Sequence, residues 1–411
     1  MSVRKNSRRM CLWLVGLAVT ALFATACGGN ESDTDTTTTV AEADDVSTTT
    51  TVAEADDVST TTTVAEGEAP STADSETTMP GEGVSVRMAR GNWSAGYLQA
   101  RIYHDLLEEL GYDVTDPSDL ELPPSSAYIS MAEGEFDFWP NSWVQLHGVF
   151  LNGTLTDGTR VRDHVSTIGS EMIEAGLQGF LTNKSLVEEH GITTIDDILN
   201  SPELVAIYDA ADTTPGDGII QLLGCPTGWG CQVTIEETIQ IAGWDNIEQI
   251  EVGTYDPLIA EAVARADDGK PFIVYSWTPS SYLTKLRPGD NVMWLALEES
   301  SVHDGSISPE LDQRGAPAAI ELDKCTADPC YLAFKASDIL VAANNDFLAN
   351  NPAAEKLLEL VQISVVDVTL QNVRYDGGEN TEEDVARHAA EWIAENREQV
   401  DEWLTEARAA A

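Results

Sequence analysis

The segment GCPTGWGCQVTIEETIQ (residues 224–240) decides the interpretation of this sequence. Two cysteines, Cys225 and Cys231, enclose a turn rich in glycine and proline around Trp229. Apolar residues at helical spacing follow over 233–242, and Gly243 ends that pattern, since glycine adopts left-handed helix ends readily. We expect the helix to begin near Gln232. The segment therefore predicts a stapled turn that leads directly into a helix.

Strand-like and helix-like patterns alternate on both sides of this segment. Such a β-α-β rhythm predicts an α/β architecture, in which ligands bind at strand ends or between lobes. The predicted strands cover 84–89, 179–182, 247–252 and 272–276, and 136–139 is predicted as a short strand or a turn. The predicted helices cover 97–110, 186–189, 233–242, 258–266, 353–361 and 382–406.

The N-terminus has the pattern of an export signal over residues 1–26. Four basic residues precede an apolar run over 11–24, which is too short for a comfortable membrane span. Small residues follow and then Cys27, an order similar to that of a bacterial lipobox, although Ala24 replaces the usual leucine. We expect Cys27 to be acylated, which leaves lipid as the only anchor. An ordinary signal peptide with an incidental cysteine is the alternative.

Residues 27–83 predict a disordered acidic tether. The unit TTTTVAEADDVS starts at Thr36, recurs at Thr48 and begins again at Thr60. Each unit has too few apolar residues to offset the entropy of ordering, and its like charges favour an extended chain. A glycosylated stalk is also compatible with this composition.

The charge balance excludes two classes of partner. The chain has 22 Lys and Arg against 70 Asp and Glu, a formal net charge of −48. Such a chain is repelled by nucleic acids and by anionic lipid surfaces. About 330 residues remain after the tether, which is enough for two lobes.

Four cysteines lie beyond the predicted lipid site, as the close pairs Cys225/Cys231 and Cys325/Cys330. Close pairs in an exported chain indicate local disulfides. Zinc is the competing interpretation, but the spacings differ from those of zinc ribbons and no histidine is near in sequence.

A calcium site is the weaker metal hypothesis. Asp209, Asp212 and Asp217 precede the cysteine loop, but Pro215 interrupts the pattern of an EF-hand. We therefore expect no metal.

Tryptophan carries most of the functional signal. Trp143, Trp229 and Trp277 lie in turn-rich segments, WPNSWVQLH, GCPTGWGC and VYSWTPSSY, although any one alone is more often structural. Several indole faces suit a sugar or a quaternary ammonium ion. A trimethylammonium group has no N–H to donate and is bound well by aromatic faces, whereas a sugar also needs many polar side chains.

Residues around the helix start predict an anion site. The free N–H groups of Gly230 and Cys231, at the beginning of a helix, favour a carboxylate. His147, four residues after Trp143, is a further candidate donor. A surface turn held by a disulfide, and a histidine of purely structural role, are the alternatives.

Together these segments resemble the periplasmic glycine betaine/proline betaine-binding proteins of the ABC importer family. The matching stretches are W-x-x-L-H over 143–147, GCPTGWGC over 224–231, YSWTPSSYLTKLRPGDNVMWL over 275–295 and ILVAANNDFLANNPAAEKLLELVQ after Asp338. The resemblance extends over most of residues 84–411. The VQ between Trp143 and Leu146, the pair Cys325/Cys330 and the tether depart from the family's pattern.

The resemblance implies an α/β fold of the type II flytrap class with two lobes. One lobe would comprise 84–178 and 296–411, and the other 179–295, with the ligand cleft between them. It also implies an extracytoplasmic protein that passes an osmoprotectant to an importer permease without a cofactor, and the predicted lipid at Cys27 would hold that protein at the membrane.

The resemblance also implies roles for individual residues. Trp143, Trp229 and Trp277 would form a cage for the ammonium group of a betaine. His147 and the backbone amides of Gly230 and Cys231 would bind its carboxylate, beside a disulfide between Cys225 and Cys231.

Two other classes of function remain as alternatives. An exported carbohydrate-binding or glycoside-cleaving protein would use tryptophan platforms and paired carboxylates. A surface adhesion protein is compatible with the tether alone. The sequence has no G-x-S-x-G or H-E-x-x-H motif, so we expect a binding protein and not an enzyme.

Overall fold

The computed structural model describes residues 79–411 of the chain. The predicted export signal, the lipid site Cys27 and residues 28–78 of the predicted tether lie outside the described residues. Residues 79–83 contact the folded part, since the Gly81 N–H donates to the carbonyl oxygen of Leu110 at 2.9 Å. Among the described residues, no helix has the length and apolar character required to cross a membrane.

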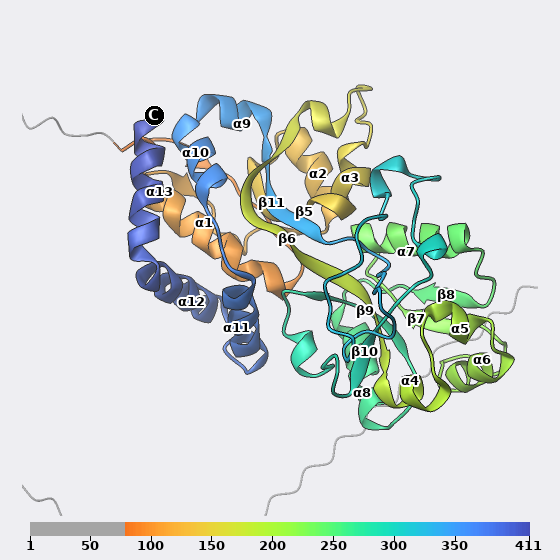
Figure 1. Ribbon diagram of the computed structural model, residues 1–411. Helices are drawn as coiled ribbons and strands as arrows, with labels where there is room; N and C mark the ends of the chain where they lie inside the picture. The colour runs from red at the N-terminus through yellow and green to blue at the C-terminus, as the bar shows by residue number, and fades with distance from the viewer. Residues whose placement is uncertain (1–78) are drawn as a thin grey trace, which may run out of the picture. The chain divides into compact units, whose positions relative to one another are not determined.

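One large sheet runs through the described part of the chain (Figure 1). Its strands mix parallel and antiparallel pairs, as in an α/β fold with crossing strands. The order across the sheet is β5 (Phe138–Trp143), β11 (Ser337–Asn344), β6 (Val165–Asn183), β9 (Ile273–Thr278), β7 (Ile220–Leu223) and β8 (Ile247–Ile250), with β10 (Val292–Leu295) also paired to β6.

Strand β6 connects the two halves of the molecule. Its first part pairs with β11, where Val165 lies opposite Asn344. Its last part pairs with β9 and β10, where Leu177 lies opposite Thr278. The sequence predicted only residues 179–182 of this 19-residue strand. The earlier part is only partly buried and carries glycine, serine and glutamate, so no apolar run marks it.

Helices cover the sheet in two groups, one for each half (Figure 1). Four short strands join the first group, where β1 (Ser85–Val86) pairs with β3 (Asp113–Val114) and β2 (Arg90–Gly91) pairs with β4 (Glu121–Leu122). The first group contains α1 (Tyr97–Glu109), α2 (Pro124–Ala132), α3 (Val144–Leu151), α9 (Asn345–Asn350), α10 (Pro352–Leu360), α11 (Val365–Asp376), α12 (Glu382–Glu395) and α13 (Arg397–Ala409). The second contains α4 (Lys184–His190), α5 (Ile195–Leu199), α6 (Pro202–Asp209), α7 (Gly230–Ala242) and α8 (Asp256–Asp267).

Helix ends follow the glycine signals in the sequence. Gly243 ends α7 at φ +69°, as predicted. Helix α7 begins at Gly230, two residues before the predicted start. The predicted helix over 382–406 is two helices, because the backbone leaves the helical region at Asn396, with ψ at 19°. There the Asn396 side chain donates to the Trp392 carbonyl oxygen at 2.8 Å and closes α12.

The segment between β10 and β11 packs against the second half. The Ile195 N–H of α5 donates to the Ala296 carbonyl oxygen at 2.9 Å, and the Thr326 hydroxyl donates to the Thr193 carbonyl oxygen at 2.7 Å. The predicted lobe boundary at residue 295 stays a prediction, and these contacts favour a return to the first lobe later, at β11.

Both predicted disulfides are present. The Cα atoms of Cys225 and Cys231 are 5.9 Å apart, and those of Cys325 and Cys330 are 6.2 Å apart. Since each sulfur atom is bonded to its partner, neither pair is available as zinc ligands.

The acidic residues of the calcium hypothesis are engaged by the protein itself. Asp212 forms a buried ion pair with Arg265 at 2.9 Å. Asp209 accepts the N–H of Gly216 at 2.9 Å, and Asp217 accepts the N–H of Ile219 at 2.9 Å. These carboxylates hold the loop in shape.

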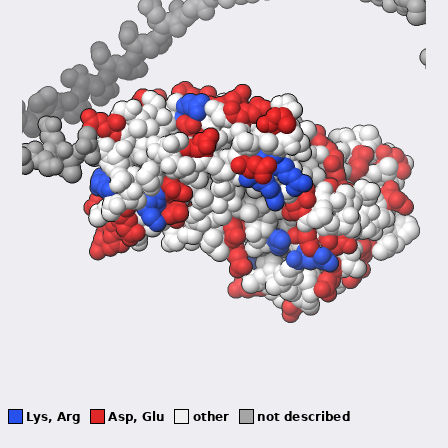
Figure 2. All heavy atoms as spheres, turned by 90° about the horizontal axis from the view of Figure 1, so that it is seen from above, with Lys and Arg blue, Asp and Glu red and all other residues white. Residues whose placement is uncertain are grey.

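Among the charged residues of the surface, acidic ones predominate. Figure 2 shows Asp and Glu side chains spread over one face, with Lys and Arg in a few small groups. The acidic excess is therefore not confined to the tether, and it disfavours docking on a polyanion.

Candidate ligand-binding site

A cavity lies where β5, β9 and the start of α7 come together, with about 320 Å³ of empty space when its open mouth is included. All six residues predicted to bind the ligand line it. The lining residues are Trp93, Pro124, Trp143, Leu146, His147, Gln178, Trp229, Gly230, Cys231, Tyr275 and Trp277. The structure thus brings the predicted residues together, and their binding roles stay a prediction.

Trp143 enters the cavity from the end of β5, immediately before α3. Its indole N–H donates to the side-chain oxygen of Asn141 at 2.9 Å, so the donor is already occupied. A Cβ atom on Gly176 of β6 would lie 2.5 Å from the Trp143 ring. A glycine at that position is therefore required for the indole to lie against the strand.

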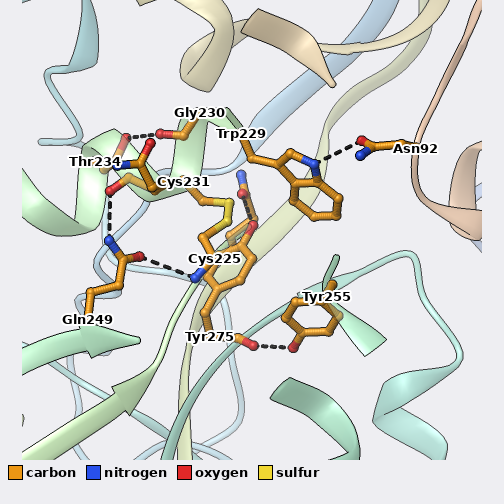
Figure 3. The surroundings of a disulfide bond; sticks show 11 residues. Asn92, Cys225, Trp229, Gly230, Cys231, Thr234, Gln249, Tyr255 and Tyr275 are labelled. Atoms are coloured by element: carbon orange, nitrogen blue, oxygen red, sulfur yellow. Dashed lines mark hydrogen bonds between the residues drawn. A yellow bond between two sulfur atoms is a disulfide. The ribbon is translucent and has the colours of Figure 1, made fainter. Parts of the chain in front are cut away.

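Trp229 lies at the N-cap of α7 and is 6% exposed. Its indole N–H donates to the side-chain oxygen of Asn92 at 2.9 Å (Figure 3). Its ring centroid is 5.8 Å from that of Trp277, at an interplanar angle of 71°. The two rings thus form a corner.

Trp277 belongs to β9 and lies within a cluster of tyrosines. Its centroid is 4.6 Å from that of Tyr255 and 5.2 Å from that of Tyr282. Tyr255 in turn donates its hydroxyl to the backbone carbonyl of Tyr275 on β9 (Figure 3). Packing on several sides therefore fixes the orientation of this indole.

One side chain of β8, that of Gln249, forms hydrogen bonds on both sides of the disulfide loop. Gln249 accepts the Cys225 N–H at 3.2 Å and donates to the Gln232 carbonyl oxygen at 3.1 Å (Figure 3). A Cβ atom on Gly230 would lie 2.5 Å from the carbonyl oxygen of Leu146, so only glycine permits this approach of α7 to α3.

The start of α7 offers backbone donors to the cavity. Gly230 and Cys231 are in its first turn and line the cavity. Within residues 79–411, no protein acceptor takes the N–H of either residue. Free amides at a helix start favour an anionic group.

His147 is a neutral donor in this site. Burial lowers the pKa of its imidazole to about 3, so the ring is uncharged at neutral pH. The backbone N–H of Trp143 donates to Nδ1 of His147 at 3.2 Å, and the Tyr128 hydroxyl lies 3.2 Å from the same nitrogen. Since Nδ1 accepts, the hydrogen of the neutral ring lies on Nε2, which leaves one N–H for a ligand.

Sequence reasoning missed part of the lining. Trp93, in RGNWSAG, has glycines around it as Trp229 does, but was not singled out. Gln178 and Tyr275 had no local signal, because only the pairing of β6 with β9 brings them to the cavity.

The lining is aromatic and uncharged. No Asp, Glu, Lys or Arg is found among the described residues that line the cavity. Each polar atom of the Gln178 side chain has one protein partner, because Tyr275 donates to its oxygen at 2.7 Å and its nitrogen donates to Ser337 at 3.3 Å. A cationic group in the cavity would be stabilised by aromatic faces, without a carboxylate.

Comparison with known families decides the class of the protein. Residues 84–395 match the model of the substrate-binding domain of ABC-type glycine betaine transport systems. This chain belongs to that family. It is therefore the substrate-binding protein of an ABC transport system, and the predictions of family, of a binding protein and of no enzymatic activity are confirmed.

Curated relatives agree over most of the chain. The glycine betaine-binding periplasmic protein OusX of Dickeya dadantii is 32% identical over 333 residues, which cover 81% of this chain and 92% of the relative. The glycine betaine/proline betaine-binding periplasmic protein of Salmonella typhimurium is 29% identical over 332 residues, which cover 81% and 92%. The extracytoplasmic location is thus supported by these periplasmic relatives.

Solved structures confirm the two-lobed α/β fold. Lactococcal OpuAC in its closed conformation with glycine betaine has a TM-score of 0.53 at 15% identity, covering 78% of this chain and 99% of that one. A choline-binding protein of an ABC transporter, in complex with choline, has a TM-score of 0.56 at 15% identity, covering 79% and 96%. At this identity the likeness concerns the fold alone.

Proposed function

We propose that this protein binds glycine betaine, or a closely related quaternary ammonium zwitterion, for uptake by its transporter. The observation that carries the proposal is the cavity's division into two chemical parts. One part is formed by indole rings, and the other offers N–H groups from a helix start and from His147. The names of the curated relatives support the same ligand class.

The ammonium group would lie among Trp143, Trp229 and Trp277. The N–H groups of Trp143 and Trp229 donate to Asn141 and Asn92, so these rings have no free donor for a ligand. Each cation–π contact contributes about 0.5–2 kcal/mol, with the higher value in a desolvated site. A methylated cation, which has no hydrogen-bond requirement, satisfies such walls.

The carboxylate would accept hydrogen bonds from His147 Nε2 and from the amides of Gly230 and Cys231. Because the imidazole is neutral, these are hydrogen bonds to an anion and not an ion pair. Hydrogen bonds to a charged group contribute about 1.5–3 kcal/mol. The anion thus has its own partners, separate from the aromatic part.

A carbohydrate ligand fits this cavity less well. Sugars require several polar side chains in addition to stacking rings. The polar groups of Gln178 are bonded to Tyr275 and Ser337, and the lining has no carboxylate among the described residues. We therefore favour the betaine over the sugar.

Binding would be linked to closure of the two lobes. Trp143 and His147 lie in the first half and Trp229 and Trp277 in the second, so a ligand in contact with all four stabilises the closed arrangement. The permease would then recognise the closed protein and receive the betaine.

The direct test is a titration of the purified protein with glycine betaine, followed by tryptophan fluorescence. We expect a saturable change with glycine betaine and none with glucose. A signal that responds to glucose and not to any betaine would contradict the proposal.

The proposal includes a lipid anchor at Cys27, based on the small residues before it. Acylation of this cysteine would retain the exported protein at the outer face of the membrane. In cells, Cys27→Ala is expected to release the protein into the soluble extracytoplasmic fraction. If the variant stays in the membrane fraction, Cys27 is not the anchor.

A further inference from the structure

We propose that Trp93 is a fourth indole wall of the ligand cavity and that Asn141 is the positioning residue that holds Trp93 and Trp143 together. This inference rests on the proposed function and deepens it. The fourth wall would set the largest ammonium group that the site accepts.

Trp93 is fixed between two other indoles. It is 8% exposed and lines the cavity. Its centroid is 5.6 Å from that of Trp139 at 85°, and 5.2 Å from that of Trp229 at 67°. These edge-to-face contacts are the arrangement that aromatic pairs prefer, so the ring has a defined place beside the cavity.

The sequence around Trp93 makes room for its ring. A Cβ atom on Gly91 would lie 2.5 Å from the Trp93 ring, and one on Gly96 would lie 3.3 Å from its indole nitrogen. Glycine at position 91 therefore lets the indole fold back over its own chain.

Asn141 joins two walls through one atom. Its side-chain oxygen accepts the indole N–H of Trp93 at 2.9 Å and that of Trp143 at 2.9 Å. An amide oxygen has two lone pairs, so both bonds are satisfied at once. Asn141 is 2% exposed and has φ at +69°, a conformation that asparagine tolerates better than most residues.

The residue before Trp93 connects this wall to the other half of the molecule. Asn92 accepts the indole N–H of Trp229 at 2.9 Å (Figure 3), while Trp93 packs against the same ring. Two consecutive residues thus contact Trp229, so Trp93 takes its place as a wall when the two halves meet.

A fourth indole limits the size of the cation. Trp93 forms one side of the cavity, whose empty space of about 320 Å³ includes its open mouth. We expect trimethylammonium to fit and triethylammonium to be excluded. Replacing Trp93 by alanine therefore has two effects, the loss of a cation–π contact and a wider cavity.

The test compares glycine betaine with its triethyl analogue, N,N,N-triethylglycine, on the full protein by calorimetry. Trp93→Ala is expected to weaken glycine betaine about tenfold and to leave triethylglycine unchanged or bound more tightly. Trp244→Ala is the matched control, since Trp244 is equally buried but bonded to Asp196 and away from the cavity. It should bind both ligands as the wild type does.

Asn141 is tested by two variants. Asn141→Gly keeps the backbone unstrained and removes the acceptor. The ratio of the affinities for glycine betaine and triethylglycine should then approach the ratio measured for Trp93→Ala. Asn141→Asp keeps an acceptor oxygen and should restore selectivity for the smaller cation. If the glycine and aspartate variants show the wild-type ratio alike, or lose binding alike in step with their thermal stability, the positioning role is overturned.

The outcomes separate this inference from the proposed function. A wild-type protein that binds no betaine contradicts the proposed function. A wild type that binds glycine betaine, together with a Trp93→Ala variant of unchanged affinity and ratio, overturns only the fourth wall.

Discussion

The two sides of the cavity are built by different means. On the first side, Trp93 and Trp143 are held by hydrogen bonds to one buried amide oxygen, that of Asn141. On the second side, Trp229 and Trp277 are held by a disulfide loop and by packing against tyrosines. We call these the amide-held wall (Trp93, Trp143) and the packed wall (Trp229, Trp277).

This difference shows which residues of the sequence determine the position of each wall. Within the packed wall, Trp229 takes its position from a contiguous motif, because the cysteines, glycines and Trp229 lie within eight residues. The amide-held wall takes its shape from residues about 50 positions apart, Trp93 and Asn141, that meet only in the folded chain. A contiguous motif of this kind is visible in a sequence. The pairing of Trp93 with Asn141 is not, although Trp143 itself was found from its own segment.

The largest expected effect comes from removing one indole from each wall. Trp143→Ala and Trp229→Ala should each weaken glycine betaine about tenfold or more, the loss of one desolvated cation–π contact. The double variant should lose about a hundredfold if the walls act independently. Calorimetric titration measures these losses, and single variants with wild-type affinity would refute the cage.

The carboxylate side gives the next effect. His147→Ala removes a hydrogen bond to the anion and should weaken glycine betaine about tenfold, with little effect on choline, which has no carboxylate. His147→Gln keeps an N–H at a similar reach and serves as the matched control. Equal losses for betaine and choline would show that His147 supports the walls and not the anion.

Removing each disulfide in turn separates ligand affinity, which depends on the packed wall, from the thermal stability of the rest of that half. Replacing Cys225 and Cys231 by serine should weaken glycine betaine by about two- to tenfold, because the loop then pays the entropy of ordering on binding. Replacing Cys325 and Cys330 should lower only the melting temperature, since that pair is absent from the cavity lining. A loss of affinity in both double variants would contradict this division.

The smallest effect on binding is expected at Glu171, which is absent from both walls. Burial raises the pKa of its carboxyl to about 8, and the Tyr103 hydroxyl donates to it at 3.1 Å. The folded state thus keeps a proton that the unfolded state releases near pH 4.5. The free energy of unfolding should therefore decrease as the pH rises from about 4.5 through 8.

Glu171→Gln removes this titration. The variant should melt several degrees higher than the wild type at pH 9, with a smaller difference at pH 5, and should bind glycine betaine unchanged. Thermal melts at both pH values provide the measurement. The same difference in melting temperature at pH 5 and pH 9 would show that Glu171 does not titrate in this range.

Features that depend on adjacent residues were predicted more completely than features that depend on long-range strand pairing. Gly243 ended α7 where expected, since a helix end depends on adjacent residues. Most of β6 was missed, because its partly polar face is compatible with a strand only when β11 is beside it. In the site, Trp229 and the amides of Gly230 and Cys231 were found from one motif. Gln178 required the register of β6 on β9.

The most direct test of the central claim uses a ligand that has the shape of glycine betaine but lacks its positive charge. Glycine betaine and 3,3-dimethylbutanoate share the carboxylate and three methyl groups, but the second has carbon in place of the ammonium nitrogen. If aromatic faces bind the cation, calorimetry should find 3,3-dimethylbutanoate bound at least tenfold more weakly. Equal affinity for the two ligands would show that the cavity recognises shape alone and would contradict the cation–π account.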